Sequence, residues 1–201
     1  MIDPFKITNY QRTTEELEEF WLFCLAVAGK RATMIAAKID EFLSGRINGE
    51  SPFEYVDRLA NSGELLGRLK EVRMGKYALL EAAFANSAEV GRLDLRGVSP
   101  QELEELPGVG PKTSRFFIMH SRENAHIAVI DTHVTKYLKE RGYDVPNGVP
   151  TGKVYARLEQ IMIAETKASG MSPADFDLAI WSHYASNGEK PLPTVPMTLA
   201  A

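Results

Sequence analysis

The residues most able to do chemistry lie between positions 106 and 133. The run Leu-Pro-Gly-Val-Gly-Pro-Lys-Thr occupies 106–113, and Val-Ile-Asp-Thr-His occupies 129–133. Glycines in a tight turn before a helix leave backbone N–H groups free to hold a phosphate. The amine of Lys112 is a nucleophile when neutral, and Asp131, nineteen positions later, can stabilise positive charge. The spacing predicts an anion cradle, a nucleophile and a carboxylate.

Two short helices and a tight turn position the cradle. The first helix is expected over 99–106, and Pro111 begins the second, where its missing N–H costs nothing. Gly108 and Gly110 are expected to adopt backbone angles that other residues resist. The N–H groups of Gly108, Gly110 and Lys112 then point outward together and bind phosphate. An ordinary helix–turn–helix corner is the alternative.

Lys112 and Asp131 support each other as a catalytic pair. A lysine in the first turn of a helix is unfavourable with the helix dipole, and this helix end with partial burial favours the neutral, nucleophilic amine. The alternative for Lys112 alone is a surface lysine that contacts phosphate. Asp131 is expected to cap a helix over 132–141, which fixes its rotamer and holds it ionised. Such a carboxylate, facing the hairpin helix, could stabilise a positive sugar in a transition state.

The fold that must position these residues is predicted to be all-α. Ser or Thr followed three residues later by an acid recurs at Thr13, Ser51, Ser99 and Ser172, which predicts helix starts. Apolar residues between these starts recur at helical spacing. Only residues 126–130 look strand-like, and they are too few to build a sheet.

Composition restricts the class of protein. The 201 residues suffice for one domain or two small ones, and 44% are apolar, which predicts a packed globular chain. Cys24 is the only cysteine, so an internal disulfide and a four-cysteine iron–sulfur site are excluded. No apolar run reaches bilayer length and no secretion signal begins the chain, so we expect a cytoplasmic protein with no membrane partner. The net charge of −4 argues weakly against nucleic-acid binding, because a local basic cleft matters more.

The two runs together resemble the helix–hairpin–helix, Gly/Pro-Asp superfamily of DNA glycosylases. The lysine position is the mark of members that are both glycosylases and AP lyases. In those enzymes the lysine attacks C1′ of the damaged nucleotide, the aspartate assists, and a Schiff base undergoes β-elimination. The resemblance implies that Lys112 and Asp131 are the catalytic residues.

The resemblance also assigns the turn. It implies phosphate binding by Gly108, Val109, Gly110 and Thr113. It implies a structural K⁺ or Na⁺ held by the backbone carbonyls of Glu104, Leu106 and Val109. No cofactor is required, and no iron–sulfur cluster is expected.

The stretch 177–181 is similar to the last helix of the compact, mainly archaeal 8-oxoguanine DNA glycosylases. The resemblance implies a base pocket that contains Trp181, Asp177 and Ile130, because a flipped base stacks on a flat apolar surface. Trp181 is otherwise a core aromatic, and Asp177 otherwise pairs locally. The chain departs from the family at Gly29, where relatives often carry Asn or Gln to fill the gap left by the flipped base. Lys30 or Arg31 is then expected to fill the gap or contact the strand.

These observations predict a two-lobed, all-α fold with a DNA-binding cleft between the lobes. The first lobe covers 21–130 and contains the helix–hairpin–helix at about 99–122. The second combines 1–20 with 131–201, and the tail from 188 is expected to be loose. Double-stranded damaged DNA would lie in the cleft, bound by a monomer associated with the nucleoid.

The predicted function is base-excision repair: a DNA glycosylase with AP lyase activity that excises 8-oxoguanine from duplex DNA. One alternative is the same chemistry on another damaged or modified base. Another is a non-catalytic helix–hairpin–helix DNA-binding module, for which the pair Lys112 and Asp131 would be unnecessary. An all-α interaction protein without a DNA role would lack salt-sensitive binding to duplex DNA.

Overall fold

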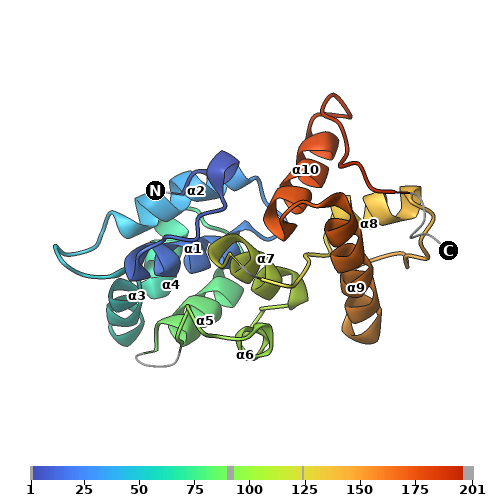
Figure 1. The fold of residues 1–201 in the computed structure, drawn as a ribbon. Coiled ribbons are helices and arrows are strands. Elements are labelled where there is room, and N and C mark those ends of the chain that lie inside the picture. The colour runs from blue at the N-terminus through green and yellow to red at the C-terminus, as the bar shows by residue number, and fades with distance from the viewer. Residues whose placement is uncertain (1, 90–92, 124, 197–201) are drawn as a thin grey trace. The chain divides into compact units, whose positions relative to one another are not determined.

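The structure is a computed structural model that describes residues 2–89, 93–123 and 125–196, and these residues form helices and connections without a strand (Figure 1). The elements are η1 (Pro4–Lys6), α1 (Thr14–Val27), α2 (Ala32–Leu43), α3 (Pro52–Asn61), α4 (Leu65–Glu71), α5 (Tyr77–Ala88), α6 (Pro100–Glu104), α7 (Pro111–Ser121), α8 (Thr132–Glu140), α9 (Gly152–Ser169) and α10 (Pro173–Ala185). The all-α prediction is confirmed. None of the described helices is long and apolar enough to cross a membrane.

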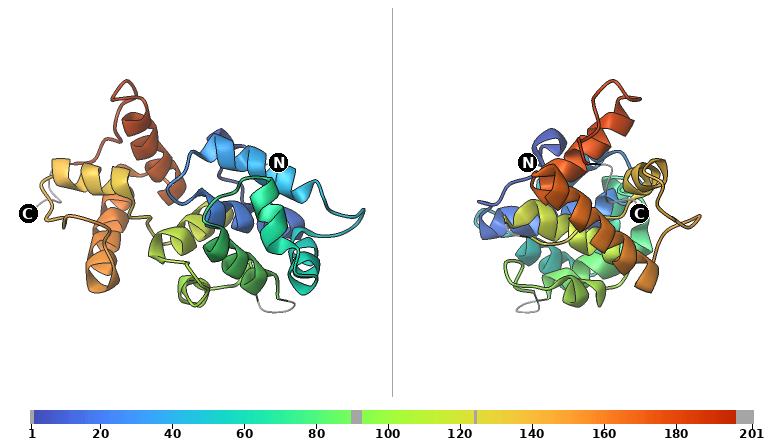
Figure 2. Two further views of the ribbon diagram at one scale, coloured as in Figure 1. Left: turned by 180° about the vertical axis from the view of Figure 1, so that it is seen from behind. Right: turned by 45° about the vertical axis from the view of Figure 1, so that its right-hand side comes forward.

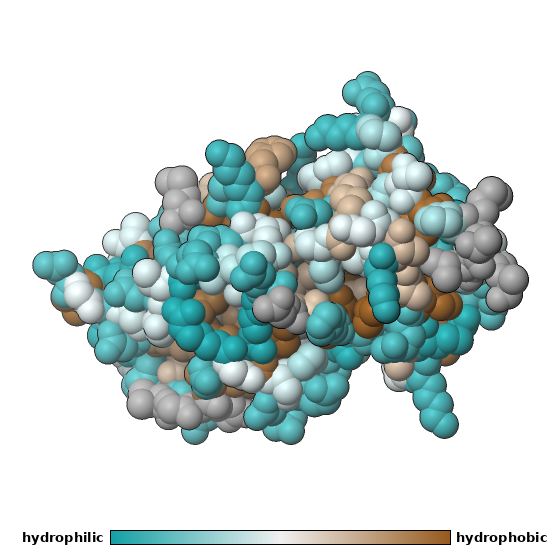
Figure 3. Space-filling model, viewed as in Figure 1, coloured by the Kyte–Doolittle hydropathy of each residue, from teal (hydrophilic) through white to brown (hydrophobic). Residues whose placement is uncertain are grey.

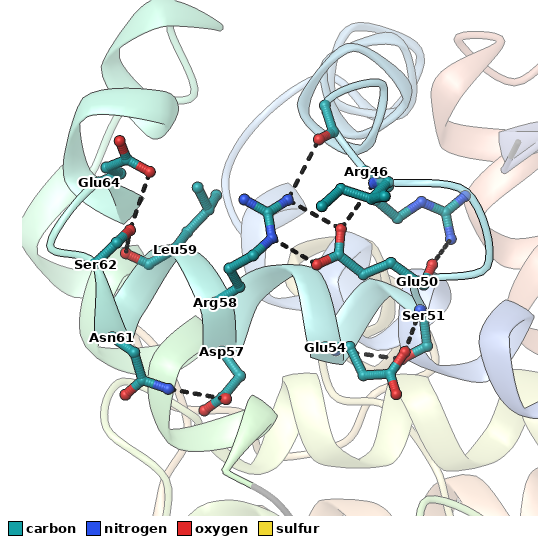
Figure 4. Close-up of polar contacts among 12 residues, drawn as sticks. Arg46, Glu50, Ser51, Glu54, Asp57, Arg58, Leu59, Asn61, Ser62 and Glu64 are labelled. Atoms are coloured by element: carbon teal, nitrogen blue, oxygen red, sulfur yellow. Dashed lines mark hydrogen bonds and ion pairs between the residues drawn. The ribbon is translucent and has the colours of Figure 1, made fainter.

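Side-chain caps begin four of these helices where the sequence predicted helix starts. The α3 start is an example, in which Ser51 Oγ accepts from the Glu54 amide and Glu54 accepts from the Ser51 amide (Figure 4). Glu50 also pairs with Arg58 at 2.7 Å and closes the turn before the helix. A cap of this kind contributes about 1 kcal/mol to stability. Thr13 and Ser99 cap α1 and α6 in the same way, and at the start of α10 the Ser172 side chain accepts from the Asp175 amide.

The chain divides into two compact units, Met1–Arg122 and Glu123–Ala201. In the first unit α1 lies in the middle and packs against α2, α3, α5 and α7 (Figures 1 and 2). Trp21 is fully buried on α1, meets Phe117 of α7 edge-on at 5.1 Å between ring centroids, and donates to Ser87 Oγ at 2.8 Å. Trp21 is thus a core residue. Hydrophilic side chains cover much of the face shown in Figure 3.

The N-terminal residues belong to the first unit, whereas the sequence predicted that residues 1–20 pack with the C-terminal helices. The amide of Asn9 donates to His120 O at 3.1 Å, and Arg12 donates to the same carbonyl at 2.9 Å. The physical reason is continuity, because α1 begins at Thr14 and runs directly into the buried Phe20. The first unit ends at Arg122, whereas the sequence predicted that the first lobe would end at residue 130.

In the second unit α8 and α9 pack against α10 around buried residues of all three helices, among them Leu138, Leu158 and Phe176. The tail, predicted to be loose from residue 188, instead packs on this core through Leu192 and Val195. Arg141 also donates to Pro196 O at 3.1 Å. Residues 197–201 lie outside the described residues.

Candidate active site

Gly108 forms the centre of the turn between α6 and α7. The turn is closed by the amide of Val109, which donates to Leu106 O at 3.1 Å. Gly108 has φ +76°, and a Cβ built there would overlap Leu79 Cδ1 of α5. Any other residue would therefore meet both backbone strain and a steric clash. The prediction of glycine for conformational reasons is confirmed at this position.

Gly110 has a different reason to be glycine. Its φ of −112° and ψ of 175° are ordinary extended backbone, so the predicted need for unusual angles was wrong here. A Cβ at Gly110 would have nothing within 4 Å, so the glycine keeps the space in front of α7 open. An approaching group could come close to the backbone at this point.

The start of α7 leaves backbone donors unused. The helix has no side-chain cap, and within the described residues the amides of Gly108, Gly110 and Lys112 donate to no acceptor. The amide of Thr113 donates back to Gly110 O at 3.0 Å, and the amide of Val109 is used in the turn. Three free amides at a positive helix end suit an anion, and the anion cradle itself remains a prediction. Thr113 and Val109 were also predicted to bind the phosphate. Because the amides of both residues are already used, Thr113 can donate only from its hydroxyl, and Val109 only shapes the turn.

Glu104 holds the two hairpin helices together, a role for its side chain that the sequence did not predict. Its carboxylate accepts from the hydroxyl of Ser114 at 2.8 Å and pairs with Arg115. Ser114 is fully buried, and Arg115 is largely so. Acidic residues near 104 and basic residues near 115 are evident in the sequence, but a contact ten positions apart leaves no local pattern.

The carbonyls of Glu104, Leu106 and Val109 remain a prediction as cation ligands. They lie in the turn between α6 and α7, and Leu106 O accepts one hydrogen bond from Val109, which leaves a lone pair. Neutral carbonyl oxygens suit a monovalent cation. No group of three or more His, Cys, Asp or Glu side chains able to hold a metal ion occurs in the described ranges.

Lys112 lies in the first turn of α7, beside the free amides. Its side chain is exposed, so the partial burial predicted for it is absent. No described residue forms a hydrogen bond or ion pair with its amine. The amine is thus free to reach a ligand in front of the helix, and desolvation of that amine would have to come from the ligand.

Asp131 caps α8, as predicted. Its Oδ1 accepts from the amides of His133 at 2.8 Å and Val134 at 2.9 Å. Its Oδ2 accepts from no described residue, and the side chain is half-buried. The cap fixes the carboxylate while one oxygen stays available for another group.

The segment before Asp131 is extended but has no strand partner among the described residues. Its backbone is satisfied by α9 instead, because the Ala128 amide donates to Glu159 Oε1 at 3.2 Å and the Ile130 amide donates to Tyr155 Oη at 3.0 Å. The strand-like pattern therefore reports a buried extended chain. Lys112 belongs to the first unit, whereas Asp131 and this segment belong to the second.

The predicted base-pocket residues separate into two kinds. Asp177 and Trp181 lie one turn apart on α10, and Trp181 is 39% exposed while Phe176 and Ile180 on the same helix are fully buried. Trp181 is therefore a surface aromatic, and the core alternative is excluded. Ile130 is buried in the core of the second unit, and its place in the base pocket remains a prediction.

Lys30 and Arg31 also differ in their availability. Lys30 Nζ donates to Met74 O at 2.5 Å and so links the turn before α2 to the turn before α5. Arg31 is exposed at the N-cap of α2 and makes no side-chain capping bond. Of the two residues predicted to fill a gap or contact a strand, Arg31 is the freer.

Known proteins resemble this chain in sequence and in fold. No family model matches the chain. An 8-oxoguanine DNA glycosylase/AP lyase of Thermotoga sp. (strain RQ2) is 31% identical over 128 residues, which are 59% of this chain and 60% of that protein. The matched part thus spans less than two thirds of that curated relative.

Two solved structures share the fold. One is the Methanocaldococcus jannaschii 8-oxoguanine glycosylase/lyase in complex with 15mer DNA containing 8-oxoguanine, with a TM-score of 0.66, 18% identity, and coverage of 92% of this chain and 88% of that chain. The other is the 8-oxoguanine DNA glycosylase of Thermotoga maritima, with a TM-score of 0.64, 25% identity, and coverage of 92% and 86%. The predicted fold class is confirmed.

Proposed function

We propose that the chain is a member of the helix–hairpin–helix Gly/Pro-Asp superfamily, and that it is a bifunctional DNA glycosylase and AP lyase that excises 8-oxoguanine from duplex DNA. The observation that carries this proposal is the start of α7, where three unused amides lie in the same turn as the exposed side chain of Lys112. A structural hairpin would need neither the lysine nor the open space at Gly110. The curated relative and both solved structures are 8-oxoguanine glycosylases, which supports this base as the substrate.

The proposed reaction begins with phosphate binding at the hairpin. The free amides of Gly108, Gly110 and Lys112 hold a backbone phosphate and so bring the nucleotide to the amine. The nitrogen lone pair of Lys112 forms a bond to C1′, and the electrons of the glycosidic bond leave with the base. The carboxylate of Asp131, held by its two amide bonds, stabilises the positive charge that develops on the sugar.

Strand cleavage follows from the covalent intermediate. Loss of a proton from the bound nitrogen and opening of the sugar ring give a Schiff base between Lys112 and C1′. Removal of a proton from C2′ then expels the 3′ phosphate, which breaks the C3′–O bond and cuts the strand. Hydrolysis of the remaining imine would release the lysine for another cycle.

Base recognition is assigned to α10. The exposed ring of Trp181 offers a flat surface for the flipped base, and Asp177 one turn earlier could accept a hydrogen bond from a base edge. A K⁺ or Na⁺ at the turn carbonyls would add positive charge next to the phosphate. We place the enzyme in the cytoplasm with the nucleoid, acting as a monomer on double-stranded DNA.

Separate measurement of base release and strand cleavage tests this proposal. Labelled duplexes would carry 8-oxoguanine, thymine glycol, uracil or an abasic site, and alkali treatment would reveal released bases that the enzyme had not cut. We expect 8-oxoguanine to be released fastest and the strand to be cut without alkali. Release of another base in preference would move the substrate, and cleavage that requires alkali would contradict the lyase.

A further inference from the structure

One edge of the extended segment before Asp131 faces two side chains of α9. The amide of Ala128 donates to Glu159 Oε1 at 3.2 Å, and the amide of Ile130 donates to Tyr155 Oη at 3.0 Å. The Tyr155 hydroxyl in turn donates to Ala128 O at 3.3 Å. Backbone groups two residues apart share one edge of an extended chain, where a neighbouring strand would bond them. Two helical side chains thus take the place of a strand.

Helix α9 gives this edge a rigid support. Tyr155 and Glu159 are four positions apart, so both side chains project from one face of the helix. Both residues are buried, as are Ala128 and Ile130. A buried backbone group that loses its partner carries the desolvation cost of that group, so each of these bonds resists breaking. The backbone that leads to Asp131 therefore has little freedom to shift.

Asp131 directly continues the supported backbone. Its φ of −108° and ψ of −170° are extended, and α8 begins at the next residue. Its Oδ1 accepts from the amides of His133 and Val134, which are the first donors of that helix. The cap fixes the carboxylate relative to α8, whereas the bonds to α9 fix the backbone that carries it. The position of the carboxylate depends on both.

A second link to α9 lies farther from Asp131. The hydroxyl of Tyr137, in the second half of α8, donates to Glu165 of α9 at 2.7 Å. Tyr137 is buried to the same degree as Tyr155, with 2% and 3% of the two residues exposed. In the part of the chain that the structure describes, Tyr155 alone of the two bonds the backbone next to Asp131. This pair of tyrosines separates the positioning of Asp131 from general support of the fold.

We propose that Tyr155 and Glu159 are positioning residues for the reaction, which hold the Asp131 carboxylate in place through the backbone that leads into it. The inference rests on the proposed function for the role of Asp131. A carboxylate that stabilises charge on a sugar must be held at short range and in a fixed direction. A displacement on the order of 1 Å can lower a rate on the order of 100-fold. Neither positioning residue needs to touch DNA, and no bond is broken at either.

The first test compares Tyr155→Phe with Tyr137→Phe, since each keeps the ring and removes one buried hydroxyl. Single-turnover excision from an 8-oxoguanine duplex should be about tenfold slower in Tyr155→Phe, while the Kd for the duplex stays within about twofold of the wild type. Tyr137→Phe should lose a comparable melting temperature and keep the wild-type rate. Wild-type excision by Tyr155→Phe, or equal rate losses in the two proteins, would overturn the proposal.

Hydrogen exchange tests the same positioning without any catalysis. The amides of His133 and Val134 report on Asp131, because both donate to its carboxylate. Their exchange should be about tenfold faster in Tyr155→Phe and less affected in Tyr137→Phe. Unchanged exchange in Tyr155→Phe would overturn the inference. A wild-type protein that excises no base would instead contradict the proposed function, and the exchange result would still decide whether α9 holds Asp131.

Two substitutions test Glu159 in the same assays. Glu159→Gln keeps an oxygen that can accept from the Ala128 amide, whereas Glu159→Ala leaves that buried amide without this acceptor. Excision should fall about tenfold in the Ala protein and stay within about threefold of the wild type in the Gln protein. A wild-type rate in Glu159→Ala would exclude Glu159 as a positioning residue.

Discussion

The starts of α7 and α8 carry the two proposed catalytic residues and are built in opposite ways. At α7 no side chain caps the helix, three amides are unused, and Lys112 adds positive charge. At α8 Asp131 fills the helix end itself, and its Oδ1 accepts two amides. One positive helix end is left for an external anion, while the other is satisfied by the chain's own carboxylate.

This difference explains why the two residues suit different tasks. A nucleophile needs access, and Lys112 is exposed with no partner among the described residues. A group that stabilises charge needs a fixed position, and Asp131 is fixed by its amides and by the buried segment before it. The comparison predicts that changes at Lys112 affect chemistry alone, whereas changes at Asp131 affect both chemistry and stability.

Lys112→Gln should give the largest effect. Loss of the nucleophile should lower base excision and strand cleavage on the order of 10⁴-fold, while DNA binding and the melting temperature change little. Single-turnover kinetics with labelled 8-oxoguanine duplex would measure it. Lys153 occupies the matching second position of α9, which also lacks a side-chain cap, so Lys153→Gln is the control. Comparable losses in both proteins would contradict the assignment.

Two substitutions separate the charge of Asp131 from its role as the cap of α8. Asp131→Asn keeps a capping oxygen but removes the charge, so the rate should fall about 10²–10³-fold with nearly unchanged stability. Asp131→Ala removes both and should also lower the free energy of unfolding by about 1 kcal/mol. Single-turnover rates and denaturant titrations would distinguish them. Equal stability of the Asn and Ala proteins would show that the cap contributes nothing.

The two hairpin glycines should respond oppositely to alanine. Gly108→Ala should lower the free energy of unfolding by about 2 kcal/mol or more, because φ is positive and Leu79 blocks the methyl group. Gly110→Ala should leave stability unchanged, since the backbone is extended and the space is open. It should still weaken DNA binding about tenfold, because the methyl group occupies the place of the phosphate. Full DNA affinity in Gly110→Ala would rule out phosphate binding at the cradle.

The second unit also contains a fully buried carboxylate, which accepts hydrogen bonds from side chains of the same unit. The change that we expect at this carboxylate is the smallest of those predicted. Glu165 accepts from Tyr137 and Tyr143, each at 2.7 Å, and from Arg141 at 3.1 Å. Burial first, and then the bond to Glu165, raises the pKa of Tyr143 to about 12. A raised folded pKa gives stability that is present below the unfolded pKa of about 10 and is lost as pH rises through about 12. Denaturant titrations between these pH values should show the free energy of unfolding decrease as the pH rises. The decrease should be smaller in Tyr143→Phe, which lacks the titrating hydroxyl.

The sequence was sufficient for features that depend on neighbours along the chain. The hydroxyl-and-acid helix starts, the turn at Gly108 and the cap by Asp131 all use residues within a few positions of each other. For the same reason the sequence alone places Asp131 at a helix start. These signals located the candidate catalytic residues and the fold class.

Features that depend on distant contacts could not be predicted. The bond of Arg12 to His120 O, which places the N-terminal residues in the first unit, spans more than a hundred positions. The clamp of Glu104 on Ser114 and the link of Lys30 to Met74 O likewise have no local pattern. The resemblance implied a place for Ile130 in the base pocket, whereas its burial in the core of the second unit depends on distant contacts that the sequence does not show.

Borohydride trapping tests the central claim most directly. The protein would be mixed with labelled duplexes carrying 8-oxoguanine, thymine glycol, uracil or an abasic site, and the adduct would be mapped by mass spectrometry. We predict a covalent adduct with the 8-oxoguanine duplex at Lys112, absent in Lys112→Gln and slower to form in Asp131→Asn. An adduct at another lysine, or no adduct on any duplex with DNA binding intact, would contradict the proposed mechanism.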